Sequence, residues 1–169
     1  MFSEIELGQV YTWRHEGRDI TFTWLGKADV APQRVYAFAF TDSGEMLLVR
    51  EVGQTVYVLP GGGVEAGEDA QEALRRELAE EAAATLTAFA YLGAQRAFDP
   101  LHGESVQAFY WARVGLANEF VPETEVVERR LLSQDNFLDT LFWGRRDPKG
   151  EWLLARAAEL DRLYSLQKS

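Results

Sequence analysis

The chain has 169 residues, enough for one domain with a sizeable core, and it carries a net charge of −10 at pH 7. This charge disfavours binding of a long nucleic acid, but a small phosphorylated ligand stays open because a bound divalent metal can reverse the local sign. The absence of cysteine excludes a disulfide framework, a thiol nucleophile and a cysteine-bound zinc site. We expect a cytoplasmic protein, because the sequence contains neither a membrane-spanning apolar run nor a recognisable secretory signal.

In chain order, the first part of the sequence predicts strands. Residues 10–17 and 19–26 alternate aromatic and polar positions, which is typical of two short strands. Residues 34–51 predict a hairpin that turns at residues 42–44. Residues 55–60 predict another short strand, which a proline ends and a loop of three glycines follows.

A helix is predicted next, over residues 69–84, because this segment contains strong helix formers and neither glycine nor proline. Aromatic and small apolar residues then predict three strands, at residues 86–98, 105–115 and 125–132. Helical spacing predicts two last helices, at residues 133–143 and 151–166, with Ser133 as a candidate N-cap of the first.

This order of elements predicts an α+β fold, with helices packed against a mixed sheet. We expect one domain over residues 1–169, with extra strands within residues 1–30 and the last helices within residues 133–169. The N-terminal aromatic strands could either cover the sheet or form a homodimer contact.

The helix predicted at residues 69–84 carries three carboxylates on one face, because Glu77, Glu80 and Glu81 stand at positions i, i+3 and i+4. Their mutual repulsion costs a few tenths of a kcal/mol per pair, and the helix dipole adds about 0.3–1 kcal/mol for each. A hard divalent cation such as Mg²⁺ would remove both penalties, and it keeps waters that substrate phosphates can replace. The glutamates alone are more typical of a solvated helix face than of a metal site, so the preceding residues have to decide.

The residues from Gly62 to the three glutamates follow a known spacing. Gly62 is followed after five residues by Glu68, and after seven more by the run from Arg76 to Glu81, which reads RELAEE. The segment resembles the Nudix box, G-x5-E-x7-R-E-U-x-E-E-x-G-U, where U is a bulky apolar residue. The last two specified positions of the box are Ala83 and Ala84 here. Because alanine is disfavoured at the positive φ through which glycine leaves a helix, we expect this helix to run further or to end differently.

The resemblance implies a Nudix-type α/β/α sandwich in which a loop-helix-loop binds Mg²⁺ or Mn²⁺. It implies that Glu77 and Glu81 are the principal metal ligands, that Glu80 is a further ligand, direct or through water, and that Gly62 offers its backbone carbonyl. All three glutamates are therefore expected to take part in catalysis. Glu68 and Arg76 would form a structural ion pair between loop and helix.

Outside the box, the resemblance implies one more ligand or base on a loop beyond the helix. Glu125 is the first choice for this catalytic role, ahead of Glu104 and Glu123, because its segment directly precedes a predicted strand. Substrate phosphates are expected to contact Arg50 and the glycine loop Gly61, Gly62 and Gly63. Four aromatic residues could stack on a base, although strand aromatics more often belong to the core: Trp13, Trp24, Phe98 and Tyr110.

The activity implied by the resemblance is that of a MutT-like, metal-dependent hydrolase that cleaves a diphosphate linkage in a nucleoside diphosphate derivative. Pro100 stands roughly where ADP-ribose-type members carry a proline, which favours an ADP-ribose-like substrate. One alternative is a pyrophosphatase for nucleoside triphosphates, including oxidised nucleotides. Another is a non-catalytic nucleotide sensor on the same fold, which the three intact carboxylates disfavour. The expected partner is a small nucleotide, with no membrane involved.

Overall fold

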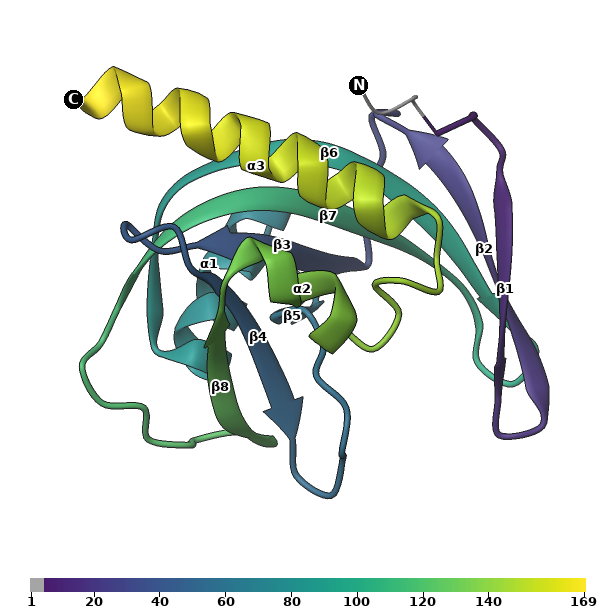
Figure 1. Cartoon of the computed structure of the whole chain (residues 1–169). Coiled ribbons are helices and arrows are strands. Elements are labelled where there is room, and N and C mark those ends of the chain that lie inside the picture. The colour runs from purple at the N-terminus through teal and green to yellow at the C-terminus, as the bar shows by residue number, and fades with distance from the viewer. Residues whose placement is uncertain (1–4) are drawn as a thin grey trace.

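The computed structural model describes residues 5–169, so the first four residues of the expected N-terminal region lie outside the described residues. A mixed sheet of eight strands runs through the molecule in the order β1-β2-β6-β7-β3-β4-β8, and β5 pairs with β3 (Figure 1). The strands are β1 Val10–His15, β2 Arg18–Gly26, β3 Arg34–Phe40, β4 Met46–Glu51, β5 Gly61–Gly63, β6 Ala84–Asp99, β7 Gly103–Leu116 and β8 Val126–Leu132. Strands β3 and β7 are parallel, and the other paired strands are antiparallel.

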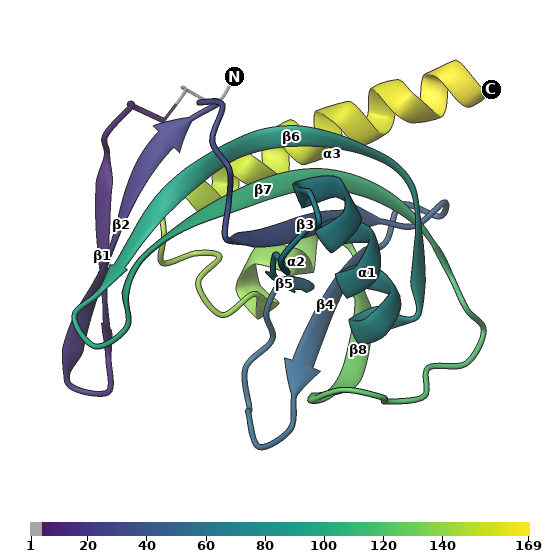
Figure 2. The same cartoon turned by 180° about the vertical axis from the view of Figure 1, so that it is seen from behind.

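Three helices cover the two faces of this sheet. They are α1 Ala70–Ala82, α2 Gln134–Thr140 and α3 Lys149–Lys168. Helix α1 lies on one face, whereas α2 and α3 lie on the other (Figures 1 and 2). The predicted α+β fold with a mixed sheet between helices is therefore confirmed. Of the helices in residues 5–169, none is long and apolar enough to cross a membrane.

The sheet separates two cores, because successive side chains of a strand point to opposite faces. In β3, Val35 and Ala37 pack in the core under α1. Tyr36 and Phe38 pack on the opposite face, in the core that α2 and α3 cover. Aromatic side chains gather in this second core, which also contains Trp111.

Strands β3 and β4 pair at Phe40 and Met46 and then diverge, which opens the sheet. Residues 57–63 occupy the opening: Val58 exchanges two backbone hydrogen bonds with Val49 of β4, and Ala37 of β3 donates to the carbonyl of Pro60. The predicted strand at residues 55–60 is therefore wrong, since this segment makes only isolated bridges in the described structure. The three glycines predicted as a loop form β5 instead, held by their pairing with β3.

Helix α1 begins as its sequence predicts. Asp69 is the N-cap: its side chain accepts a hydrogen bond from the Glu72 N–H at 2.8 Å, and the Glu72 carboxylate accepts from the Asp69 N–H at 2.8 Å. This capping box satisfies two backbone donors that a helix start leaves free. Ser133 likewise occupies the N-cap position of α2, as predicted, and its hydroxyl oxygen accepts a hydrogen bond from the Asn136 side chain.

The end of α1 differs from the expectation. Ala83 adopts the left-handed conformation, with φ 49° and ψ 43°, so the helix ends at the box position that usually carries glycine. The expectation of a longer helix or another exit is therefore wrong. Neighbouring groups hold the turn, since Arg129 donates to the carbonyl of Ala82 at 2.8 Å and Ala117 donates to that of Ala83 at 3.0 Å. The cationic Arg129 also opposes the negative end of the helix dipole.

Candidate functional site

Helix α1 and strand β5 bring two of the predicted carboxylates against the glycine segment. Glu81 accepts a hydrogen bond on Oε2 from the N–H of Gly61 at 2.9 Å. A Cβ atom at Gly62 would lie 2.5 Å from Oε1 of Glu77, and one at Gly61 would lie 2.0 Å from the carbonyl oxygen of Val35. Glycine at these two positions therefore allows β5 to lie close to β3 on one side and to both carboxylates on the other.

Arg76 ties this arrangement together. It binds Glu68 through two hydrogen bonds, from Nη2 at 2.6 Å and from Nε at 3.1 Å, so the predicted ion pair is formed. Its Nη2 also donates to the Gly63 carbonyl at 2.8 Å, and its Nη1 donates to Glu77 Oε1 at 3.0 Å. The hydrogen bonds between Arg76 and Glu68 lower the pKa of Glu68. The same bonds are the main cause that raises the pKa of Arg76. The guanidinium thus fixes the loop, the helix and one carboxylate at once.

Glu80 is more exposed than the other two glutamates. Its side chain is 49% exposed and meets Arg76 Nη1 at 3.2 Å. Within residues 5–169, no three acidic or histidine side chains converge closely enough to hold a metal ion by themselves. The structure therefore brings together Glu77 and Glu81, and it leaves Glu80 at the solvent edge of the site.

The two inner carboxylates are unfavourably placed as bare anions. Burial raises the pKa of Glu81 to about 8, against the opposing hydrogen bond from Gly61, and the negative charges of Glu77 and Glu51 add to the rise. Burial also raises the pKa of Glu77, against the opposing effect of Arg76. Mg²⁺ is commonly held by one or two carboxylates, with waters and substrate phosphates completing the octahedron. Two adjacent, desolvated carboxylates beside a backbone turn fit this donor set.

Glu81 and Gly61 also line a cavity of about 250 Å³. Seven of its lining side chains are aromatic, and they come from β1, β2, β3, β7 and the segment after α2. These are Tyr11, Trp13, Phe22, Tyr36, Phe109, Phe142 and Trp143. Trp13 meets Phe142 edge to face, with ring centroids 4.7 Å apart, so the N-terminal strands and the segment after α2 close on each other. Such a cavity can accept a flat ring next to an anionic group bound at the glutamates.

Two charged residues of this cavity were missed by the sequence-based predictions. Arg34 lines the wall and donates from Nε to the Tyr36 hydroxyl at 2.7 Å, and its positive charge acts on Glu77 and Glu81. Glu51 lines the same cavity at the end of β4. Successive side chains of a strand point to opposite faces, so Arg50 and Glu51 point to opposite sides of β4. Strand alternation in the sequence does not show that a cavity lies beside Glu51.

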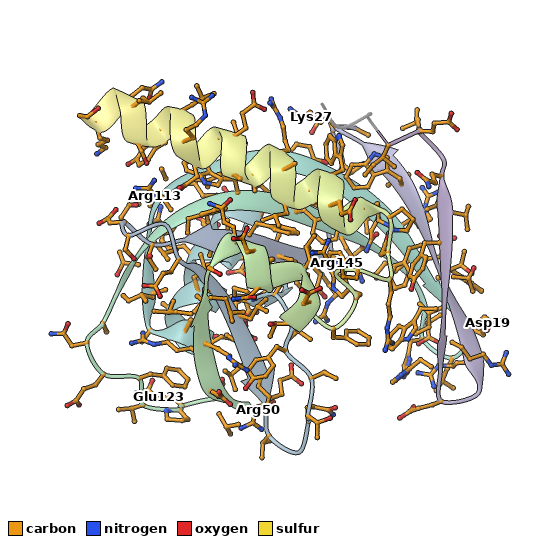
Figure 3. All side chains as sticks on the ribbon, viewed as in Figure 1. Asp19, Lys27, Arg50, Arg113, Glu123 and Arg145 are labelled. Carbon is orange, nitrogen blue, oxygen red and sulfur yellow. The ribbon has the colours of Figure 1, made fainter. Side chains whose placement is uncertain are left out.

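Arg50 is not among the residues that line the cavity. Its Nε donates to Glu128 of β8 at 2.9 Å, and its Nη1 donates to the Gln54 carbonyl at 3.1 Å, so Arg50 is engaged at the β4–β8 edge (Figure 3). Glu125 lies on the exposed connection before β8, and its carbonyl accepts from the N–H of Val52 at 2.7 Å. Its backbone therefore runs beside the end of β4, next to Glu51.

The remaining candidates lie apart from the glutamates. Glu123 is exposed on the connection between β7 and β8 (Figure 3). Glu104 is exposed near the β6–β7 turn, 4.0 Å from Arg96. Of the aromatic candidates, Trp24 and Tyr110 are core residues, Phe98 is 45% exposed, and Trp13 lines the cavity.

Comparison with known proteins agrees with this geometry. The family model described as the NUDIX domain matches residues 31–153, which include β5, α1 and all the box residues. The chain belongs to the Nudix family. The predicted resemblance is thereby confirmed, and the chain is a Nudix hydrolase. Its family acts on nucleoside diphosphate derivatives and generally uses a divalent metal, with Glu77 and Glu81 as the donors best placed for one here.

Solved structures share the fold. A pyrophosphohydrolase of Bacillus subtilis, BsRppH, aligns with a TM-score of 0.59 and 22% identity over 72% of this chain and 77% of that chain. The NUDIX domain of Shewanella oneidensis NrtR, solved with ADP ribose, aligns with a TM-score of 0.58 and 21% identity over 80% of this chain and 90% of that chain. A MutT protein of Bacillus halodurans aligns with a TM-score of 0.58 and 18% identity over 75% of this chain and 82% of that chain. No curated protein matches the sequence.

Proposed function

We propose that this protein hydrolyses a diphosphate linkage in an ADP-ribose-like nucleoside diphosphate derivative, with Mg²⁺ or Mn²⁺. One observation carries the proposal: Glu81, which lies next to Glu77 on α1, lines a cavity together with seven aromatic side chains. An anion-binding site joined to a stacking surface suits a nucleoside linked to a diphosphate. The NrtR domain, a structural neighbour, was solved with ADP ribose, which supports this class of ligand.

The chain's own residues would share the work as follows. Glu77 and Glu81 would hold the cation, with the Gly62 carbonyl beside them, and the Gly61 N–H and Arg76 keep the two carboxylates in place. A bound divalent cation would neutralise the diphosphate and make the attacking water more acidic. The positive charge of Arg34 would attract the diphosphate, because its side chain lines the cavity that contains Glu81. The aromatic walls would hold the base and exclude water from it.

In the reaction, a water oxygen forms a bond to phosphorus, the anhydride P–O bond breaks, and a carboxylate takes the proton of the water. Glu51 is our proposal for that carboxylate, because it lines the cavity, whereas Glu125 is not among the lining residues. Replacing Glu51 with glutamine should lower kcat by about a hundredfold or more, and Glu125→Gln should change it by less than about threefold. The reverse order in a steady-state assay would make Glu125 the base.

The rival substrate class is a nucleoside triphosphate, including oxidised nucleotides, and it is supported by the MutT protein among the structural neighbours. The rival of another class is a sensor that binds the nucleotide without cleaving it. Both rivals use the same cavity, so products and rates have to separate them.

The test is release of phosphate-containing products from ADP-ribose, nucleoside triphosphates, dinucleoside polyphosphates and sugar nucleotides, with Mg²⁺ or Mn²⁺ and after chelation. Wild type should cleave ADP-ribose in a metal-dependent way, and Glu81→Gln should lose at least about a hundredfold in kcat. Glu80→Gln is the matched control on the same helix and should lose much less, because Glu80 faces solvent. Turnover of triphosphates alone would favour the first rival. Tight ADP-ribose binding without any product would establish the sensor.

A further inference from the structure

One residue of the cavity lining carries a buried acceptor that has no protein partner. Gln95 of β6 is 5% exposed and lines the cavity. Its Nε2 donates to Oε1 of Gln107 on β7 at 2.9 Å. Its Oε1 is the one buried side-chain polar atom without a hydrogen-bond partner among residues 5–169. A buried acceptor left unpaired costs about 1–3 kcal/mol, so its place in a ligand cavity suggests that a ligand supplies the donor.

The register of the sheet connects this acceptor to the glutamate end of the site. Gln95 is paired with Gln107, Gln107 with Arg34 of β3, and Arg34 with Gly63 of β5. Neighbouring strands lie about 4.8 Å apart, so this row of residues leads from Gln95 to the glycine segment over about 14 Å. A nucleoside with its phosphates attached can span that separation. One ligand could therefore reach both ends of the row.

Two other polar residues of this cavity are paired within the protein. Asp147 accepts from the Lys149 N–H at 3.0 Å and from Lys149 Nζ at 2.6 Å, which occupies both its carboxylate oxygens. Arg34 is bonded to the Tyr36 hydroxyl. Aromatic rings make up most of the remaining lining. A hydrogen-bond donor on a stacked ring could therefore pair with Oε1 of Gln95, which has no protein partner.

We infer that Gln95 is the residue that selects the nucleobase, and that its Oε1 accepts a hydrogen bond from an exocyclic amino group of the base. Adenine and cytosine carry this donor, whereas hypoxanthine and uracil carry a carbonyl at the same position. A carbonyl there would place two acceptors against each other in a buried site, and such a mismatch is strongly disfavoured. This inference rests on the proposed function for its view of the ligand as a nucleotide, but it concerns recognition of the base and no step of the hydrolysis.

Binding of mononucleotides tests it without any hydrolysis. Trp13 and Trp143 line the cavity, so ligand binding can be followed by tryptophan fluorescence. Two matched pairs differ chiefly in the amino and carbonyl groups: AMP with IMP, and CMP with UMP. In buffer with Mg²⁺, wild type should bind the amino member of each pair about tenfold more tightly, which corresponds to one well-made hydrogen bond. Equal affinities within both pairs, or no binding of any of the four nucleotides, would overturn the inference.

Three variants show whether Gln95 is the cause. Gln95→Met keeps the length of the side chain and removes the acceptor, so it should weaken AMP binding and abolish the preference for AMP over IMP. Gln107→Met removes the partner of Gln95 Nε2 and leaves Oε1 in place, so it should retain the preference for AMP. Gln167→Met, at the exposed end of α3, is the control for the substitution itself. A preference for AMP that persists in a folded Gln95→Met protein would refute the role of Gln95.

Hydrolysis of ADP-ribose and its inosine counterpart then separates this inference from the proposed function. Metal-dependent turnover with equal kcat/KM for the two would support the hydrolase and contradict the selection of the base. A preference for AMP in the binding assay without turnover of any diphosphate would contradict the hydrolase and support the base selection. The two claims can therefore fail independently.

Discussion

The two ends of the cavity are built in contrasting ways. The glutamate end comes from one continuous stretch, β5 and α1, whose parts are joined by ion pairs and by glycines that allow close approach. The base end is assembled from β1, β2, β3, β6, β7 and the segment after α2, and it is held by aromatic packing. The family match begins at residue 31, so β1 and β2 precede it. The end that performs the chemistry is thus shared with the family, whereas part of the end that selects the substrate lies outside the matched region.

The largest effect expected from a single methyl group is at the glutamate end. A Cβ atom at Gly62 would lie 2.5 Å from Oε1 of Glu77 and has to displace that carboxylate. A displacement of about 1 Å in such a site can cost about a hundredfold, so Gly62→Ala should lower kcat by that factor. Gly63→Ala is the matched control, because the nearest atom to its Cβ would lie 4.0 Å away. Similar kcat values for the two variants would show that the contact between β5 and α1 does not hold the glutamates in place.

The glutamate end should make the stability of the protein depend on pH when no divalent cation is present. The pKa of Glu81 is about 8 in the folded protein and near 4.5 ordinarily, so between these values the folded protein holds a proton that the unfolded chain has released. The free energy of unfolding should therefore fall as the pH rises through this range. Glu81→Gln should flatten the fall, so its Tm in chelator should exceed that of wild type by several degrees at about pH 9 and by less at about pH 5.

A divalent cation supplies the check on this pH effect. Because it favours the charged form of Glu81, added Mg²⁺ should raise the Tm of wild type at about pH 9 more than that of Glu81→Gln. Calorimetry with and without chelator measures both differences. Parallel Tm curves for the two proteins across this pH range would mean that Glu81 is solvated rather than buried.

Substitutions at the base end should change the affinity for nucleotide and leave the rate of hydrolysis nearly unchanged. Stacking of a base on an aromatic ring is worth about 1–3 kcal/mol, so Trp13→Ala should weaken nucleotide binding by about tenfold and leave kcat nearly unchanged. Phe98→Ala removes an aromatic residue from the neighbouring strand β6, where the side chain is 45% exposed. This control should bind as wild type does. Equal losses in the two variants would place the ligand outside the aromatic walls.

The contrast between the two ends also explains what the sequence could and could not predict. The glutamate end was predictable because its residues follow a fixed spacing along one loop and one helix. Residues 69–84 predict α1, and Arg76 and Glu68 form the expected ion pair. The base end was not predictable from the sequence, because its lining residues are far apart in the chain and meet only in the folded sheet. Gln95 in particular is an ordinary strand residue in the sequence. Its unpaired oxygen becomes evident only when β6 and β7 are in register.

Two errors in the predicted elements have local physical causes. Gly61–Gly63 has almost no strand propensity, yet it forms β5 because the divergence of β3 and β4 leaves β3 unpaired at that place. Arg50 was expected at the phosphates, but in this structure its guanidinium pairs with Glu128, the residue opposite it on β8. Tertiary pairing decides both cases, and neither leaves a mark in local composition.

The smallest effect expected is at the end of α1. Ala83 has φ 49°, a conformation that costs an L-residue about 1–2 kcal/mol and glycine almost nothing. Glycine also gains freedom in the unfolded chain, which offsets about half of this, so Ala83→Gly should raise the free energy of unfolding by about 0.5–1 kcal/mol. Ala82→Gly, one residue earlier and still helical, should lower it by about 1 kcal/mol. Urea unfolding compares the two. Arg129 and Ala117 already bind the carbonyls of this turn, so kcat should be the same in Ala83→Gly as in wild type. A changed kcat would show that Ala83 affects the position of Glu81.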